Sequence, residues 1–141
     1  MYLRSFQLSD YAPITGLLSD VLSESCFRET MEAFGRQLSW DSELVLVAEE
    51  EGAVTGVIIG TIDRNNGYYY RIAVDKQHQR KGIGTAMVEG LRKRFEKRKV
   101  SKIMVTVDAH NEYILPLYES VGYQREQFTR AFQKLRIVSG A

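Results

Sequence analysis

The hydrophobic period of the chain changes at Gly82, and this change constrains the fold more than any other feature. Residues 68–74 are aromatic and β-branched, which is typical of a strand. After Gly82, apolar side chains recur every four residues and predict an amphipathic helix, carried by Ile83, Met87, Leu91 and Phe95. Residues 103–107 then alternate, as a strand with one buried face does. A strand–helix–strand unit implies two parallel strands joined by a right-handed crossover.

The rest of the chain adds strands and helices to this unit. Residues 2–8 alternate apolar and polar side chains, and two helices follow, the second beginning near residues 26–28. Two apolar runs, 44–48 and 54–62, flank a Glu-Glu-Gly turn and predict an antiparallel hairpin. A short helix over 115–120 and two strands near 123–126 and 129–137 complete the chain. The predicted order is βααβββαβαββ, an α/β protein with a mixed sheet.

Length and composition set the class of protein. The 141 residues fit one domain, 1–141, and a 44% hydrophobic, 26% charged chain is ordinary for a globular protein. The formal charge of +1 gives no general reason to expect a nucleic-acid or membrane partner. No apolar run approaches the roughly 18 residues of a membrane span. The single cysteine, Cys26, and a polar start without the apolar core of a signal peptide predict a cytoplasmic protein.

The turn between the strand and the helix at Gly82 has the chemistry of an anion site. Gly82 and Gly84 lack Cβ atoms, so the backbone can approach a ligand closely, and the free amides of a helix start attract anions. Arg80 and Lys81 add positive charge. Neither of two better-known phosphate loops fits, because the Walker A spacing is absent and Met87 stands where the Rossmann pattern needs a small residue. The alternative interpretation is that the two glycines only form a tight turn with positive charges at its rim, without binding an anion.

Two motifs carry a family resemblance. The pattern Gln79-x-x-Gly82-x-Gly84 follows the strand end Ile72-Ala73-Val74. Further on, Asn111, Leu117-Tyr118 and Gly122-Tyr123 stand in order. Together they resemble the GNAT superfamily of N-acetyltransferases over about residues 54–123, and the predicted element order agrees with that fold, a splayed central sheet flanked by helices.

The resemblance implies acetyl-CoA as cosubstrate and assigns roles to the matching residues. The backbone of the strand end would pair with pantetheine, the turn and helix start would hold the pyrophosphate, and Asn111 would contact the pantetheine. A bulge typical of the family would expose backbone amides near Arg71 and Ile72 that polarise the thioester carbonyl. Tyr118 is the expected general acid toward the CoA thiolate, and packing in the core is its alternative role. The expected cofactor-binding residues are Ile72, Ala73, Val74, Gln79, Arg80, Lys81, Gly82, Ile83, Gly84, Thr85 and Asn111.

The sequence identifies neither the acceptor nor the general base. Two GNAT subfamilies carry a glutamate where this chain has Tyr68 or Thr106, so neither specialist signature is present. Tyr68 and Tyr70 are candidate acceptor-pocket residues, although aromatic residues on a strand face more often pack. Four acidic residues are further candidates to attract a cationic amine, namely Glu24, Glu29, Glu32 and Asp41. Trp40 is either a lid or a core residue.

The function implied is acetyl transfer from acetyl-CoA directly to a primary amine of a small molecule, polyamine or protein. A non-catalytic CoA-binding sensor, or an acyltransferase that uses another acyl-CoA, is the alternative. The basic run at 92–99 includes Phe95, which belongs to the apolar helix face, so no nucleic-acid partner is predicted. No metal site is predicted, because His78 and His110 lack ligands at suitable spacing. A homodimer through the final strands is expected.

Overall fold

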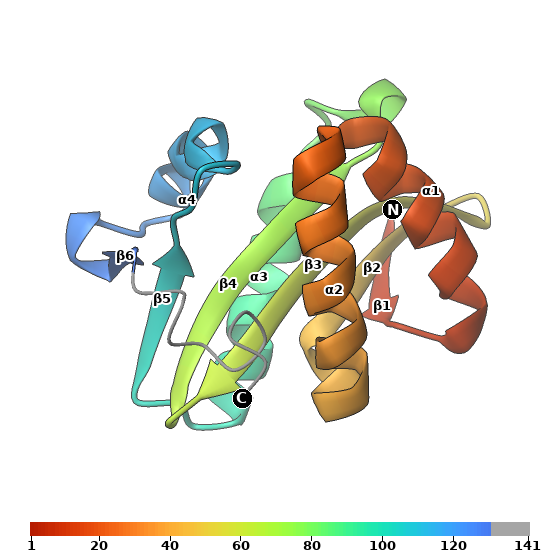
Figure 1. The fold of residues 1–141 in the computed structure, drawn as a ribbon. Coiled ribbons are helices and arrows are strands. Elements are labelled where there is room, and N and C mark those ends of the chain that lie inside the picture. The colour runs from red at the N-terminus through yellow and green to blue at the C-terminus, as the bar shows by residue number, and fades with distance from the viewer. Residues whose placement is uncertain (131–141) are drawn as a thin grey trace.

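A six-stranded mixed sheet lies at the centre of the computed structural model, which describes residues 1–130 (Figure 1). The strands lie side by side in chain order: β1 (Tyr2–Ser5), β2 (Val45–Glu50), β3 (Ala53–Asp63), β4 (Asn66–Val74), β5 (Lys102–Thr106) and β6 (Phe128–Thr129). Strands β1 to β4 pair with one another in antiparallel fashion, whereas β5 is parallel to β4 and β6 is parallel to β5. The parallel pairing predicted across the helix that follows Gly82 is confirmed.

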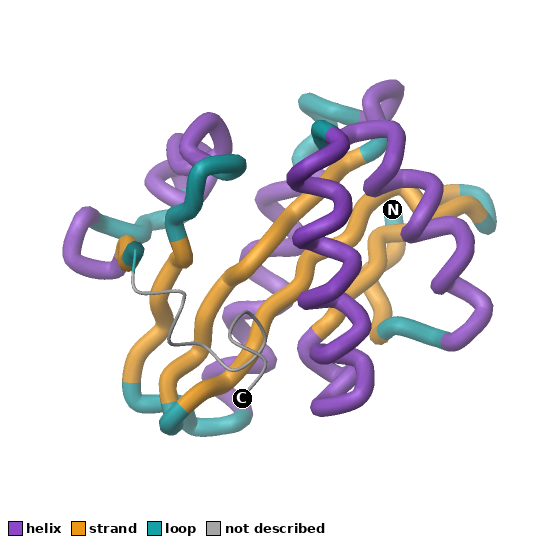
Figure 2. Tube along the Cα trace, viewed as in Figure 1, coloured by secondary structure: helices purple, strands orange, loops and turns teal. Residues whose placement is uncertain are grey.

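Helices cover both faces of the sheet. Figure 2 shows α1 (Tyr11–Val21) and α2 (Glu24–Asp41) on one face and α3 (Ile83–Lys97) on the other, while α4 (Leu115–Ser120) follows β5. Each face has its own apolar cluster, because strand residues alternate between the two sides. Phe95 is fully buried beneath α3, as its helical spacing predicts, and is not available to stack on bases.

The sheet opens between β4 and β5. Pairing of these strands ends at Tyr69 and Val105, so the rest of β4 has no strand partner on that side among residues 1–130. In the β3–β4 pairing, the register shifts between Ile59 and Gly60, which leaves Tyr70 as an extra residue. Figure 1 shows β5 diverging from β4 toward α4. The splay predicted from the family resemblance is therefore confirmed, and it places the end of β4 at an open position in the sheet.

The prediction of a strand over 123–126 is wrong. Tyr123 is buried instead, with its ring 5.3 Å from that of Tyr69, and residues 125–127 form a 3₁₀ turn. Gln124 and Gln127 close that turn, because the Gln124 amide donates to the Gln127 side chain at 3.0 Å. Strand pairing resumes only at Phe128–Thr129. Most of the strand predicted over 129–137 lies outside the described residues.

We expect Gly60→Ala to destabilise the protein. A Cβ atom at Gly60 would lie 2.8 Å from Leu91 Cδ2, and 3.0 Å from both Phe95 Cζ and the Tyr68 carbonyl oxygen. Overpacking of this kind costs about 1–3 kcal/mol, measurable by urea unfolding. Gly35→Ala on α2 is the matched control, since its Cβ would meet nothing within 4 Å. Equal stability of the two variants would contradict the close approach of α3 to the sheet.

Candidate functional site

A cavity of about 370 Å³ lies where β4 passes into α3. Its walls come from the end of α1, the end of β4, the glycine turn and the segment that leads into α4. Nine of the predicted cofactor residues line it: Ile72, Ala73, Val74, Gln79, Arg80, Gly82, Ile83, Gly84 and Thr85. The cavity also has lining residues that sequence reasoning missed, namely Val21, His78, Tyr113, Ile114 and Leu117. Lys81, Asn111 and Tyr118 do not belong to the lining.

The glycine turn presents uncapped backbone amides to this cavity. Gly82 is the N-cap residue of α3 and has φ +83°, a left-handed conformation that glycine adopts without strain. No side chain caps the helix there, and the first intrahelical bond runs from the Ala86 amide to the Gly82 carbonyl. The amides of residues 83–85 therefore have no partner within the helix. A Cβ at Gly84 would lie 3.1 Å from Leu117 Cδ2, so this glycine also keeps α4 close to the turn.

The open edge of β4 forms the second element of the cavity wall. Residues 72–74 lie beyond the last β4–β5 pair, so their backbone on that side faces the splay and not another strand. Gln79 reaches back to this edge, where its Nε2 donates to the Val74 carbonyl at 3.1 Å. An extended ligand can add to such an edge as a strand does. The cavity therefore combines a strand edge with an anion-binding helix start.

Asn111 holds the end of β5 in place. Its Oδ1 accepts from the Asp108 amide at 2.8 Å, and its Nδ2 donates to the Thr106 carbonyl at 2.6 Å. Asn111 is buried, so both bonds are shielded from water. Asn111 does not line the cavity, so these two bonds give it a structural role at the end of β5.

Tyr118 is buried on α4 among other tyrosines. Its ring centroid lies 5.2 Å from that of Tyr69 and 6.3 Å from that of Tyr123. Burial raises the pKa of the Tyr118 hydroxyl above its usual value, and the nearby charge of Arg71 opposes part of this rise. The hydroxyl therefore holds its proton more firmly than the hydroxyl of an exposed tyrosine does.

A buried ionic network occupies the splay, and sequence reasoning missed it. Arg71, 3% exposed, lies 3.1 Å from Asp108 through Nη2 and Oδ2, and its Nε donates to Thr30 Oγ1 of α2 at 2.9 Å. Glu29 Oε2 lies 3.8 Å from the Arg71 guanidinium and 3.1 Å from His110 Nε2. The sequence did contain a signal for this network, because Arg71 stands within an otherwise apolar strand end. A charged residue at such a position is buried, and buried charges are rare unless they are paired.

The two candidate tyrosines of β4 do not line the 370 Å³ cavity. Tyr70 is 1% exposed, its hydroxyl accepts from Arg71 Nη2 at 3.2 Å, and the guanidinium lies 4.6 Å from its ring centroid. Tyr68 is half-buried on the same strand. Among the acidic candidates of α2, Glu24, Glu32 and Asp41 are paired with Arg28, Arg36 and Arg98, and Trp40 is 41% exposed. Only Glu29 reaches the splay.

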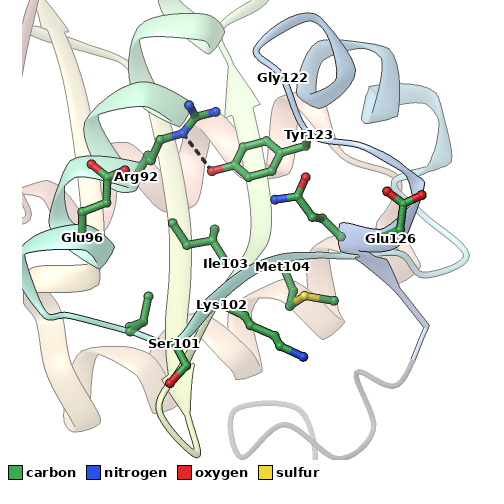
Figure 3. A pocket seen from close by; sticks show the side chains of 11 residues that line it. Arg92, Glu96, Ser101, Lys102, Ile103, Met104, Gly122, Tyr123 and Glu126 are labelled. Carbon is green, nitrogen blue, oxygen red and sulfur yellow. Dashed lines mark hydrogen bonds between the residues drawn. The ribbon is translucent and has the colours of Figure 1, made fainter.

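A larger cavity, about 580 Å³, lies away from the glycine turn, along β5 (Figure 3). Arg92 of α3 donates to the Tyr123 hydroxyl at 3.0 Å on one side, and Lys102 and Glu126 lie on the other. Its walls contain none of the predicted site residues. Within residues 1–130 there is no group of three or more metal-ligating side chains, and no helix long and apolar enough to cross a membrane.

Comparison with known proteins identifies the family. Residues 14–139 match the family model described as an acetyltransferase (GNAT) domain, so the chain belongs to the GNAT acetyltransferases and is an acyltransferase. It is 28% identical to Acetyltransferase YE1169 of Yersinia enterocolitica, with 89% of each chain covered.

Solved structures agree with the fold. The ribosomal-protein-S18-alanine N-acetyltransferase from Escherichia coli superposes with a TM-score of 0.66 and 25% identity, covering 87% of this chain and 77% of that one. The PaiA N-acetyltransferase from Thermoplasma acidophilum, solved in complex with coenzyme A, gives a TM-score of 0.66 and 15% identity over 87% and 89% of the two chains. This fold binds acetyl-CoA or CoA.

Replacement of Asn111 by alanine should destabilise the fold even without ligand. The change leaves the Thr106 carbonyl and the Asp108 amide without their side-chain partner, at about 1–3 kcal/mol for each buried group. Urea unfolding of the ligand-free protein measures this loss, with Glu119→Gln on the exposed side of α4 as control. An Asn111→Ala protein as stable as the control would show that Asn111 does not hold β5.

Proposed function

We propose that the protein transfers the acetyl group of acetyl-CoA directly to a primary amine, with the cofactor bound in the 370 Å³ cavity. The observation that carries this proposal is the meeting of two features in one cavity wall: the uncapped amides of the α3 start and the unpaired edge of β4. The first suits a pyrophosphate and the second suits the amide groups of pantetheine. Family membership and the CoA complex of the PaiA relative support the same cosubstrate.

Each part of the site then has a role in catalysis. Amides of residues 83–85, with Arg80, hold the pyrophosphate, and the β4 edge at 72–74 orients the pantetheine arm. Acetyl-CoA supplies an activated acetyl group. The backbone amide of Ile72, two residues after the extra residue Tyr70, would donate to the thioester oxygen as negative charge develops there. Tyr118 keeps its proton until the thiolate forms and then donates it.

The alternatives are a CoA-binding sensor without turnover and an acyltransferase that uses another acyl-CoA. The acceptor is a small-molecule amine, a polyamine or a protein amine, and action of the Escherichia coli relative on a ribosomal protein alanine fits the last of these. A single acetyltransferase domain over 1–141, a cytoplasmic location and a homodimer stay predictions from the sequence.

Coenzyme A should raise the melting temperature of the protein. A ligand that binds only the folded state stabilises it by about 2.7 kcal/mol at a hundredfold excess over its Kd. Thermal unfolding with CoA and acetyl-CoA measures this. The acetyl-CoA-saturated protein is then offered spermidine, glucosamine, lysine and an alanine-starting peptide while free thiol is followed. No thermal shift at millimolar CoA contradicts the proposed function, and a shift without thiol release favours the sensor alternative.

Tyr118→Phe should reduce turnover and preserve CoA binding. The variant removes only the hydroxyl, so the ring contacts with Tyr69 and Tyr123 persist. Loss of a general acid lowers kcat by about 10²–10⁴-fold. Thiol release measures kcat, and the CoA-induced thermal shift shows that the cavity is intact. Unchanged kcat would leave Tyr118 with a packing role alone.

A further inference from the structure

The 370 Å³ cavity continues into a second cavity of about 490 Å³. The two share three lining residues, Val21, Gln79 and Tyr113. These come from the end of α1, the turn after β4 and the segment after β5, so a molecule in the second cavity lies beside the open end of β4. The second cavity therefore has the position that an acceptor needs, because the two substrates of a direct transfer must meet.

Neither cavity has a carboxylate in its wall. Among residues 1–130, no aspartate or glutamate lines either of them, and residues 131–141 contain neither residue type. Arg80 of the first cavity and Lys76 of the second are cations. His78 and His110 also line the cavities, and a histidine adds positive charge or none, so the sign of the wall charge does not depend on their protonation.

The carboxylates next to these walls have partners within the protein. Four of them contact the two histidines, namely Glu29, Glu50, Asp75 and Asp108. Glu29 and Asp108 lie 3.8 and 3.1 Å from Arg71 Nη2. Asp75 and Glu50 lie 2.7 and 3.5 Å from the ring nitrogens of His78. None of the four lines either cavity, so a ligand in the cavities touches none of them.

Lys76 is available to a ligand in the second cavity. It is exposed on the short 3₁₀ turn Lys76–His78 and forms no ion pair with another residue of 1–130. The turn is held without it, because the Asp75 side chain accepts from the Gln77 amide at 3.1 Å. Much of the remaining wall is apolar, and its apolar residues are Val21, Leu22, Cys26 and Ala109.

We propose that the second cavity receives the acceptor and selects an amine that also carries a carboxylate, which Lys76 binds. This inference rests on the proposed function. The Lys76 ammonium donates to the carboxylate, and the apolar wall contacts the carbon atoms between the carboxylate and the amine. A polyamine would instead bring a second positive charge to Lys76, with no carboxylate in the wall to offset the repulsion. Lys76 sets specificity and takes no part in the chemical step.

The test compares three amines that differ only in the group at the far end of the chain. They are β-alanine, n-propylamine and 1,3-diaminopropane, and 6-aminohexanoate, n-hexylamine and 1,6-diaminohexane extend the comparison to a longer reach. Thiol release from the acetyl-CoA-saturated protein gives kcat/KM. At one length or both, the carboxylate should raise kcat/KM about fivefold over the simple amine, as one ion pair at a solvent-accessible site does, and the diamine should be the poorest acceptor.

Charge variants of Lys76 test its role directly. Lys76→Met should remove the preference for the carboxylate, and Lys76→Glu should reverse it, so that the diamine becomes the best acceptor. Lys102→Glu makes the same charge change on the wall of the 580 Å³ cavity and is the matched control, which should keep the wild-type order. CoA should stabilise all of these variants as it does the wild-type protein, since neither lysine lines the 370 Å³ cavity.

Three results would overturn the inference. The first is a wild-type protein that prefers the diamines or treats the three amines alike at both lengths. The second is the same change of order in Lys76→Glu and Lys102→Glu.

The third result comes from binding and needs no turnover. NMR titration of the CoA-saturated protein with 6-aminohexanoate should shift the Lys76 amide signal, and Lys76→Met should weaken the binding. No shift at Lys76 in the wild-type protein contradicts the site. If CoA itself does not stabilise the protein, the proposed function fails, whereas CoA binding without carboxylate selection overturns this inference alone.

Discussion

The ion pair between Arg71 and Asp108 joins the two strands at the point where the sheet opens. Backbone pairing between β4 and β5 stops at Tyr69, and beyond it this side-chain pair connects the end of β4 to the segment after β5. Both residues are almost fully buried, so removal of either one leaves an uncompensated charge and costs about 3–5 kcal/mol. The width of the splay, and with it the shape of the 370 Å³ cavity at the end of β4, depends on this contact.

The network around the pair also connects α2 to the sheet. Arg71 donates to Thr30, and Glu29 lies next to it on the same helix. The register shift near Tyr70 makes this possible, because the extra residue lets Tyr70 and Arg71 both contact the α2 side. A bulge in β4 therefore has two effects: it interrupts the regular β3–β4 pairing, and it turns the Arg71 guanidinium toward α2.

Much of the fold could be predicted because its signals are local. The four-residue spacing after Gly82 indicated α3, and the glycines of the turn between Gln79 and Gly84 indicated free backbone amides at the helix start. The Glu29–His110 contact could not be predicted, since the two residues are far apart in the sequence and meet only when α2 packs beside the open sheet. The burial of Tyr123 was missed for a similar reason, because its hydroxyl is placed by Tyr69 and Arg92 on other elements.

The two cavities draw their walls from different parts of the chain. The glycine turn and the β4 edge line the 370 Å³ cavity, whereas Cys26 on α2 and His110 line only a neighbouring cavity of about 490 Å³. A substitution at Cys26 can therefore change the shape of the neighbouring cavity while the glycine turn and the β4 edge stay unchanged.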